Sequence, residues 1–213
     1  MRLKAWTAES SPCCIFCHRS ISCIEGYRAT ERGIDLSRKF VLLTGCSGGG
    51  KSTLLKALEE RGFPTVQEPG RRIVSDELTG QGKALPWVDM KAFALRAVEM
   101  AKSDLQVAQH IDGIVFFDRG LIDAAVALAH SGGQTMKDTL GETQAYWRRV
   151  FAVPPWRELF TNDAERRHNF DAAMQEHLRI EEALDALGYI RIELPKVSVQ
   201  ERAEIVLKEC GAL

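Results

Sequence analysis

The sequence predicts an α/β fold in which helices cover both faces of a parallel β-sheet. Short apolar segments typical of buried strands alternate along the chain with amphipathic segments of helical period. Glycine or proline residues stand at several of the boundaries between these segments. The chain has 213 residues, of which 45% are hydrophobic and 27% are charged, so it can bury a core without disulfides or a structural metal.

The first half of the chain contains two expected strands and two expected helices. Residues 40–44 are an apolar strand, and residues 51–61 form a helix that carries leucines on one face and ends at Gly62. A short second strand is expected at 64–67. Over 86–110 apolar residues recur near helical spacing, and we expect the proline at the start of this segment to open the helix.

The second half of the chain repeats this alternation, and breaks in the pattern set the boundaries. A Ser131-Gly132-Gly133 turn ends one predicted helix, Pro154-Pro155 ends a predicted strand, and Gly188 stops another helix. The expected strands are 114–117, 149–153 and 189–194, and the expected helices are 121–130, 171–187 and 199–210.

Residues 1–38 differ from the rest, because charged residues, Ser, Thr, Gly and Cys are mixed there without a sustained period. We expect a weakly structured extension ahead of one domain at 39–213. Four of the six cysteines lie in this extension, and a zinc knuckle is the open alternative, with the ligands Cys14, Cys17, His18 and Cys23. Since the cysteines are not spread through the fold and the start lacks the apolar core of a signal peptide, we expect a cytoplasmic protein.

Charge and hydropathy argue against two classes of partner. The formal net charge is −1, so bulk electrostatics gives no reason to expect binding to a nucleic acid or to an anionic membrane surface. No apolar run approaches the roughly 18 residues that a membrane-spanning helix needs. We therefore expect neither nucleic acid nor membrane as a partner, and a small molecule instead.

A phosphate-binding loop is the strongest functional signal. The motif G-x-x-x-x-G-K-[ST] is complete between the first strand and the first helix: Gly45-Cys46-Ser47-Gly48-Gly49-Gly50-Lys51-Ser52, followed by Thr53. Its glycines let backbone N–H groups approach phosphates, and the helix N-terminus adds a positive potential. We expect Lys51 to neutralise the β- and γ-phosphates of a nucleotide and the Ser52 hydroxyl to bind Mg²⁺.

A second magnesium ligand is expected at the end of the third strand. Four apolar residues precede Asp118, which is the form of a Walker B strand, and parallel strands present their carboxyl ends to the same crevice. Arg119 follows, where many motor ATPases place a glutamate that activates water. An Asp-Arg pair suits a phosphoryl transferase, whose arginine contacts phosphate oxygens. A surface salt bridge is the other interpretation of Arg119.

The segment 161–168 is dense in charged residues and lies between two segments of helical pattern. Small-molecule kinases close a lid that carries arginines over the transferring phosphate and so exclude water from it. Arg166 and Arg167 are candidates for this catalytic role, and a solvated helix start is the alternative that the charge of the segment leaves open.

With these motifs the chain resembles a known family. The P-loop, Q-E-P-G-R-R at 67–72, F-D-R-G at 117–120, P-P-W at 154–156 and L-P at 194–195 occur in the same order in small predicted ATPases. These are grouped with the kinase-like domain of the bacterial ribosylnicotinamide kinase/NAD regulator, and the similarity covers roughly residues 38–212. The resemblance implies a nucleotide-kinase-like P-loop NTPase fold with five parallel strands in the order 2-3-1-4-5, and ATP with Mg²⁺ as ligands.

The Glu-Pro step after the second predicted strand also resembles the deoxynucleoside kinases, in which the matching glutamate activates the acceptor hydroxyl. Carried over to this sequence, the resemblance makes Glu68 the candidate base and Arg71 or Arg72 a substrate-binding residue. The sequence departs from those kinases at Asp118-Arg119, where they have Glu-Arg-Ser.

Two functions from different classes follow from these patterns. The leading hypothesis is an enzyme, an ATP-dependent phosphotransferase that acts on a small hydroxylated metabolite, for which a nucleoside is one candidate. The alternative is a regulatory ATPase that binds a nucleotide, hydrolyses it slowly and signals to a partner. Late in the chain there is no N-K-x-D or T-K-x-D string, which favours ATP over GTP.

Overall fold

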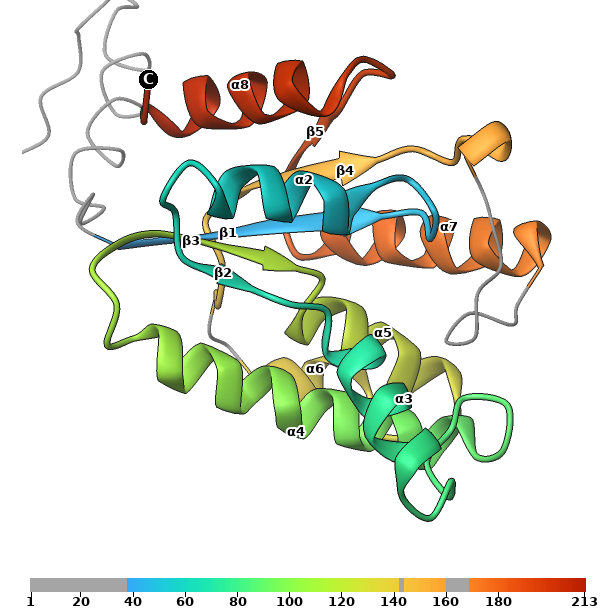
Figure 1. The fold of residues 1–213 in the computed structure, drawn as a ribbon. Helices are drawn as coiled ribbons and strands as arrows, with labels where there is room; N and C mark the ends of the chain where they lie inside the picture. The colour runs from blue at the N-terminus through green and yellow to red at the C-terminus, as the bar shows by residue number, and fades with distance from the viewer. Residues whose placement is uncertain (1–37, 142–143, 160–168) are drawn as a thin grey trace, which may run out of the picture. The chain divides into compact units, whose positions relative to one another are not determined.

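Parallel strands form the centre of the fold. The computed structural model describes residues 38–141, 144–159 and 169–213. Its strands are β1 (Arg38–Gly45), β2 (Thr65–Val66), β3 (Gly113–Asp118), β4 (Arg149–Val153) and β5 (Ile190–Glu193). Every neighbouring pair is parallel, and the order in the sheet is β2-β3-β1-β4-β5 (Figure 1). This arrangement confirms the predicted fold class and strand order.

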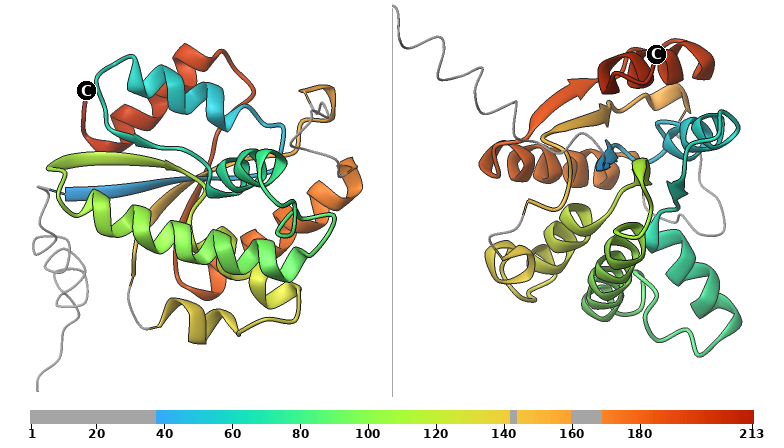
Figure 2. Two further views of the ribbon diagram at one scale, coloured as in Figure 1. Left: turned by 60° about the horizontal axis from the view of Figure 1, so that its bottom comes forward. Right: turned by 90° about the vertical axis from the view of Figure 1, so that its left-hand side faces the viewer.

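Helices lie on both faces of this sheet (Figure 2). They are α2 (Lys51–Glu59), α3 (Pro69–Thr79), α4 (Met90–Ala108), α5 (Leu121–His130), α6 (Met136–Leu140), α7 (Phe170–Ala186) and α8 (Val199–Cys210). A short 3₁₀ helix at Arg157–Leu159 follows β4. The helices α2 and α8 pack on one face, whereas α4, α5 and α7 pack on the other (Figure 1).

The core has two layers, one on each side of the sheet. On β1, Leu42 faces the layer of α4 and α5, whereas Val41 and Leu43 face the layer of α2 and α8. On β3, Phe117 faces the first layer and Phe116 the second. Both faces of these strands are buried, which explains why their sequences are continuous apolar runs rather than alternating ones.

The helical layers differ from the sequence prediction in two respects. The expectation that Pro86 opens the long helix is wrong. α4 begins at Met90, because the side chain of Asp89 accepts a hydrogen bond from the backbone N–H of Ala92 (2.9 Å) and caps the helix there. α3 and α6 are additional helices, and too few of their residues are buried to give the sequence a helical period.

Some predictions fall on residues that the structure does not describe. The predicted extension at 1–38, except for its last residue, lies outside the described residues, and so do its candidate zinc ligands and the pair Arg166 and Arg167. In the described part, Cys46 and Cys210 are buried thiols. None of the helices there is both long and apolar enough to cross a membrane.

The sheet order determines where a ligand can bind. β1 lies between β3 and β4. After β1 the chain forms β2 and β3 on one side of this strand, and after β3 it crosses to β4 on the other side. Open α/β sheets bind their ligands beyond the carboxyl ends of the strands at such a reversal. The loop after β1 and the residues that end β3 both lie at this edge.

Candidate active site

The loop between β1 and α2 has the backbone of a phosphate-binding turn. Gly45, Gly48 and Gly50 have φ angles of 106°, 86° and 74°, which residues with a side chain rarely adopt. Gly49 is needed for a different reason, because a Cβ there would lie 2.3 Å from Cγ1 of Val153 on β4. The glycines therefore let the loop bend tightly against β4, and turns of this kind form concave sites for anions.

Arg202 of α8 supports this loop. Its Nη1 donates a hydrogen bond to the carbonyl of Gly49 (3.1 Å), and its guanidinium lies over the ring of Trp156, 5.2 Å from the ring centroid. The residue is buried, and burial lowers the pKa of Arg202. The hydrogen bond joins two residues that lie 153 positions apart in the chain, so sequence patterns do not reveal it.

The side chain of Lys51 turns back onto the phosphate-binding loop and contacts its carbonyl groups. Its ammonium group donates hydrogen bonds to the carbonyls of Cys46 (2.7 Å) and Gly45 (3.2 Å), and the residue is buried. Burial lowers the pKa of Lys51, and the charge of Arg119 lowers it further, against the opposing effect of nearby carboxylates. A nucleotide phosphate would offer the ammonium group charged acceptors in place of neutral carbonyls, so this position fits the predicted role.

Ser52 and Asp118 lie side by side and fit a magnesium ion. The Ser52 hydroxyl donates a hydrogen bond to Oδ2 of Asp118 (2.7 Å), whereas the buried Oδ1 has no hydrogen-bond partner among the described residues. Burial, and then the charge of Glu68, raise the pKa of Asp118 to about 6. A divalent cation would satisfy the orphaned oxygen and keep the carboxylate ionised, and Mg²⁺ prefers hard oxygen ligands of this kind.

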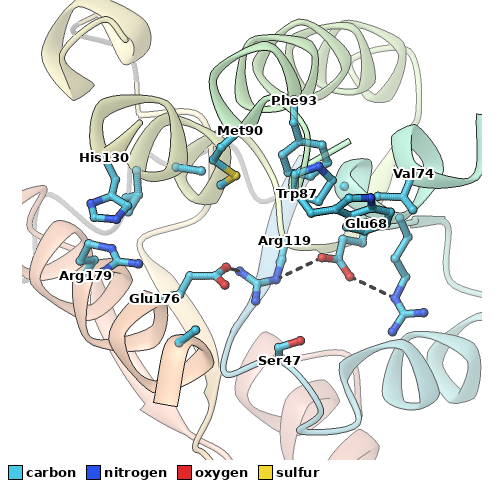
Figure 3. A pocket seen from close by; sticks show the side chains of 16 residues that line it. Ser47, Glu68, Val74, Trp87, Met90, Phe93, Arg119, His130, Glu176 and Arg179 are labelled. Carbon is cyan, nitrogen blue, oxygen red and sulfur yellow. Dashed lines mark hydrogen bonds and ion pairs between the residues drawn. The ribbon is translucent and has the colours of Figure 1, made fainter. Parts of the chain in front are cut away.

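Arg119 is the centre of a buried ion network (Figure 3). Its guanidinium lies 2.6 Å from Glu176, 3.3 Å from Asp123 and 3.4 Å from Glu68. Burial alone would lower the pKa of Arg119, but the charges of the surrounding carboxylates outweigh this effect and raise it. The residue is only 8% exposed, so the interpretation of Arg119 as part of a surface salt bridge is wrong.

Asp123 completes this network, although the sequence analysis does not single it out. Its Oδ1 accepts a hydrogen bond from the hydroxyl of Thr44 (2.5 Å), and its Oδ2 accepts one from the backbone N–H of Gly120 (3.2 Å). Burial raises the pKa of Asp123, while Arg119 and Thr44 act in the opposite direction. The one local signal for Asp123 is its place as the third residue of a predicted helix, where an acidic side chain caps the helix.

A pocket of about 380 Å³ opens beside this network (Figure 3). One wall is formed by α3, by the segment before α4 and by the first turn of α4, with Gly70, Arg71, Val74, Pro86, Trp87, Met90 and Phe93. The other wall is formed by α5 and α7, with Val126, Ala127, His130, Ala172, Glu176 and Arg179. Glu68, Arg119 and Ser47 lie between the two walls. Apolar walls with a few charged groups are typical of a small-molecule site.

Arg71 and Arg72, which the sequence leaves as alternative substrate-binding residues, differ in their contacts in the structure. Glu68 precedes α3 directly, and its Oε2 lies 3.3 Å from Nε of Arg71, which lines the pocket. Arg72 turns to α4 instead, where its Nη1 lies 2.8 Å from the carboxylate of Asp104, and it does not line the pocket. Of the two, the structure therefore brings only Arg71 to the site.

Most of the residues that line the pocket are missed by sequence reasoning, among them Trp87, His130, Glu176 and Arg179. Trp87 lies in the turn before α4, where the prediction places a helix. Glu176 and Arg179 are three residues apart on α7 and therefore share a face. The spacing of Glu176 and Arg179 is the pattern from which they could have been predicted. In the sequence, however, a charged helix face that lines a pocket looks the same as a charged helix face that is exposed to solvent.

The fold and the site together define a class of protein. A complete phosphate-binding loop after the central strand of a sheet ordered 2-3-1-4-5 is the architecture of a P-loop nucleotide-binding protein with a nucleotide-kinase fold. The sequence model of the AAA domain family matches residues 40–202, well over half of the chain, so the protein belongs to that family.

A relative in sequence is also described as a nucleotide-binding protein. A nucleotide-binding protein of Granulibacter bethesdensis is 40% identical over 68 residues, which are 32% of this chain and 21% of that protein. This chain therefore matches about a fifth of that relative's length.

Solved structures of kinases share the fold. Deoxyadenosine kinase from M. mycoides with bound dATP has a TM-score of 0.60 and 14% identity, over 81% of this chain and 99% of that chain. Shikimate kinase from Acinetobacter baumannii in complex with shikimate has a TM-score of 0.53 and 18% identity, over 82% and 93%. Thymidylate kinase from Ehrlichia chaffeensis has a TM-score of 0.53 and 14% identity, over 81% and 98%. These similarities show the fold.

Proposed function

We propose that this protein is an enzyme that transfers the γ-phosphoryl group of ATP to a hydroxyl group of a small molecule, for which a nucleoside is one candidate. The observation that supports this proposal most is the carboxylate of Glu68, which lines the pocket and lies 3.4 Å from Arg119. A protein that only switches between nucleotide states needs no second pocket with a base in it. The phosphotransferase is therefore preferred over the regulatory ATPase.

The nucleotide end of the proposed site consists of residues 45–53. The loop would hold the phosphates, with Lys51 neutralising their charge. Ser52 and Asp118 would hold Mg²⁺, which when bound screens the phosphate charges. Arg119, which follows Asp118 directly and lies 3.4 Å from Glu68, would contact the oxygens of the transferring group.

At the acceptor end, Glu68 acts as the general base. It accepts the proton of the acceptor hydroxyl as that oxygen forms a bond to the γ-phosphorus, and the bond from this phosphorus to the bridging oxygen breaks so that ADP leaves. Arg71 and Arg119 contact different oxygens of Glu68, which fixes the orientation of the carboxylate. Such fixed geometry is a large part of phosphoryl-transfer catalysis.

The same proposal also covers the lid, the cellular compartment and the class of acceptor. Arg166 and Arg167 would close over the transferring phosphate as parts of a lid. The enzyme would act in the cytoplasm. The known kinases that share the fold act, by their names, on deoxyadenosine, shikimate and thymidylate, which supports a small-molecule acceptor here. The resemblance to the ribosylnicotinamide kinase domain is consistent with a nucleoside among the candidates.

A screen of acceptors tests the proposed function. ADP release is measured with MgATP alone and after addition of hydroxylated metabolites, among them nucleosides. A phosphotransferase is expected to show strong stimulation by its acceptor. A slow rate that no small molecule changes would instead support the regulatory ATPase.

Lys51→Ala tests the nucleotide end of the site. Because the ammonium group contacts loop carbonyls rather than the apolar core, the variant should keep the fold without ligand. It should lose most of the thermal stabilisation by MgATP, together with turnover. A variant that binds and turns over ATP like the wild type would refute the phosphate-loop assignment.

A further inference from the structure

Two side chains on the α5–α7 wall of the pocket, Arg179 and His130, have no acidic partner among the described residues. Arg179 is half-buried on α7, and His130 is exposed at the end of α5. Both line the pocket. Within residues 38–141, 144–159 and 169–213, neither side chain has a hydrogen bond or an ion pair with another residue. They therefore face the pocket with their donors available to a ligand.

The other charges of the pocket are compensated. Arg71 pairs with Glu68, and Arg119 pairs with Glu68 and Glu176. Among the described residues that line the pocket, the guanidinium of Arg179 therefore gives an excess of positive charge, although the chain as a whole has a net charge of −1. A half-buried guanidinium has lost part of its hydration, and an anionic group would restore charge-assisted hydrogen bonds to its planar set of donors.

This basic pair lies apart from the phosphate-binding loop. In Figure 3, Ser47 marks the end of the pocket that belongs to the loop, and Arg179 and His130 lie at a distance from it, on the side of α5 and α7. Arg119 and Glu176 lie between them in this view. The anion that Arg179 would bind is therefore a group other than the phosphate chain of a nucleotide held by the loop.

The rest of the pocket surface is largely apolar. Trp87, Met90 and Phe93 form much of one wall, and Val126 and Ala127 contribute apolar surface from α5. Such walls suit a ring or another apolar body, and they leave recognition of charge to the few polar groups. The pocket thus offers three features to one ligand: a base, an apolar middle and a separate cationic end.

We infer that the acceptor carries a negatively charged group, a carboxylate or a phosphate, which Arg179 and His130 bind while its hydroxyl group faces Glu68. This inference rests on the proposed function and narrows it, because the favoured substrates are anionic hydroxylated compounds rather than neutral nucleosides. Arg179 is then a residue that determines specificity for the acceptor.

Matched pairs of compounds test the inference. The protein saturated with MgADP is titrated with uridine and orotidine, which differ by a ring carboxylate, with adenosine and adenosine 3′-phosphate, and with hydroxylated ring carboxylates and their amides. Binding is followed by calorimetry and by the shift in Tm. In at least one class, the anionic member is expected to bind about 10-fold more tightly than its neutral counterpart.

Arg179→Met shows whether this preference comes from the proposed group. The substitution keeps an apolar stem of similar length and removes the guanidinium, so it should abolish most of the preference for the anion. Lys102→Met is the matched control, because it removes the same charge from an exposed position on α4 outside the pocket. The control should keep the wild-type preference.

The outcomes separate this inference from the proposed function. A preference confined to carboxylates or to phosphates identifies which anion the site takes. Equal binding within every pair, no binding by any anionic compound, or an unchanged preference in Arg179→Met would overturn the inference. ADP release is measured with the same compounds. Anionic ligands that bind without stimulating release would refute the phosphotransferase alone, whereas stimulation by neutral compounds only would refute the anion site alone.

Discussion

At the scale of single residues, Arg119 is held in a conformation that its neighbours must enforce. Its φ angle of 57° lies in the left-handed region, which costs a residue with a side chain about 1–2 kcal/mol. Its backbone N–H donates a hydrogen bond to the carbonyl of Leu43 (2.8 Å), and three carboxylates surround its guanidinium. These contacts offset the strain and direct the side chain toward Glu68 and the pocket.

Glu68 and Asp118 can be distinguished by isosteric substitutions. Glu68→Gln keeps the size of the side chain but cannot accept a proton, so kcat should fall by about 10²–10⁴-fold with little change in MgATP affinity. Asp118→Asn removes a proposed magnesium ligand, so it should weaken MgATP binding and raise the Mg²⁺ concentration needed for activity. These effects are measured from kcat, from the Kd for MgATP and from the Mg²⁺ dependence of kcat.

The control for these substitutions is Glu60→Gln, at an exposed position after α2. It should behave like the wild type. An exchange of the two phenotypes between Glu68 and Asp118 would reverse the assignment of base and metal ligand. Full activity in Glu68→Gln would mean that this carboxylate only fixes the loop, through its contacts with Arg71 and Arg119.

His177 on α7 predicts a pH dependence of stability. Burial lowers the pKa of His177 from its ordinary value of 6.5, with Glu181 opposing the shift. Three cations from other elements lower it further: Lys51, Arg119 and Arg191. The unfolded chain therefore binds a proton more readily than the folded one, so the stability that depends on neutral His177 is present above pH 6.5 and is lost as the pH falls below it.

Chemical denaturation at several pH values measures this effect. Below pH 6.5 the free energy of unfolding of the wild type should fall with a contribution from His177 of at most about 1.4 kcal/mol per pH unit. His177→Gln should remove that contribution, and His110→Gln, at an exposed position, is the control. Identical pH profiles for the wild type and His177→Gln would show that the fold does not discriminate against the protonated imidazole.

At the scale of elements, the turn between β3 and α5 sets the position of the site. Gly120 has extended backbone, so its φ angle does not require glycine. A Cβ there, however, would lie 2.1 Å from the hydroxyl oxygen of Tyr146, which itself accepts a hydrogen bond from the backbone N–H of Leu121 (2.8 Å). Burial raises the pKa of Tyr146, so this hydroxyl keeps its proton. Close packing is thus what requires glycine at this turn.

Gly120→Ala should therefore destabilise the protein by about 1–3 kcal/mol, the usual cost of overpacking. Equilibrium denaturation measures this change. Tyr146→Phe alone should cost about 1 kcal/mol, because the N–H of Leu121 loses its acceptor. In the Gly120→Ala background the same substitution should cost less or become stabilising, since it removes the clashing oxygen. A Gly120→Ala protein as stable as the wild type would contradict this account of the turn.

At the scale of the whole molecule, the sheet order assembles the site from distant parts of the chain. The P-loop follows β1, Asp118 ends β3, Glu68 follows β2, and Glu176 comes from α7. Parallel register places the carboxyl ends of β1, β2 and β3 at one edge, with Leu43 beside Asp118 and Val66 beside Phe117. Among the described residues, those of both core layers follow Arg38 in the chain. We therefore predict that a domain at 39–213 is sufficient to form the site.

A chain that begins at Ser37 tests this domain boundary. It should unfold cooperatively and keep its stabilisation by MgATP, because β1 begins at Arg38 and the core residues follow it. Thermal denaturation with and without MgATP measures both properties, and metal analysis of the full chain accompanies it. Failure of the shortened chain to fold, or loss of one equivalent of zinc on shortening, would support the cluster of Cys14, Cys17, His18 and Cys23.

Sequence reasoning succeeds where packing follows a local period. The helix at 121–130, the strand at 149–153 and the helix at 199–210 have the predicted bounds. It fails for α3 and α6, which present few buried residues, and at Pro86, where the cap formed by Asp89 decides where α4 begins. The strand order was implied by family resemblance, since strand patterns alone do not specify which strands are neighbours.

The sequence by itself determined the phosphate-binding loop, the alternation of strands and helices, and the carboxylate that ends β3, because each depends on residues close together in the chain. Only the tertiary structure decided that Arg71 rather than Arg72 lines the pocket, that Asp123 joins Thr44 to Arg119, and that Arg179 lines the pocket with no acidic partner among the residues that the structure describes. The physical reason is that these contacts join helices and strands that meet only when both faces of the sheet are covered, so no local spacing records them.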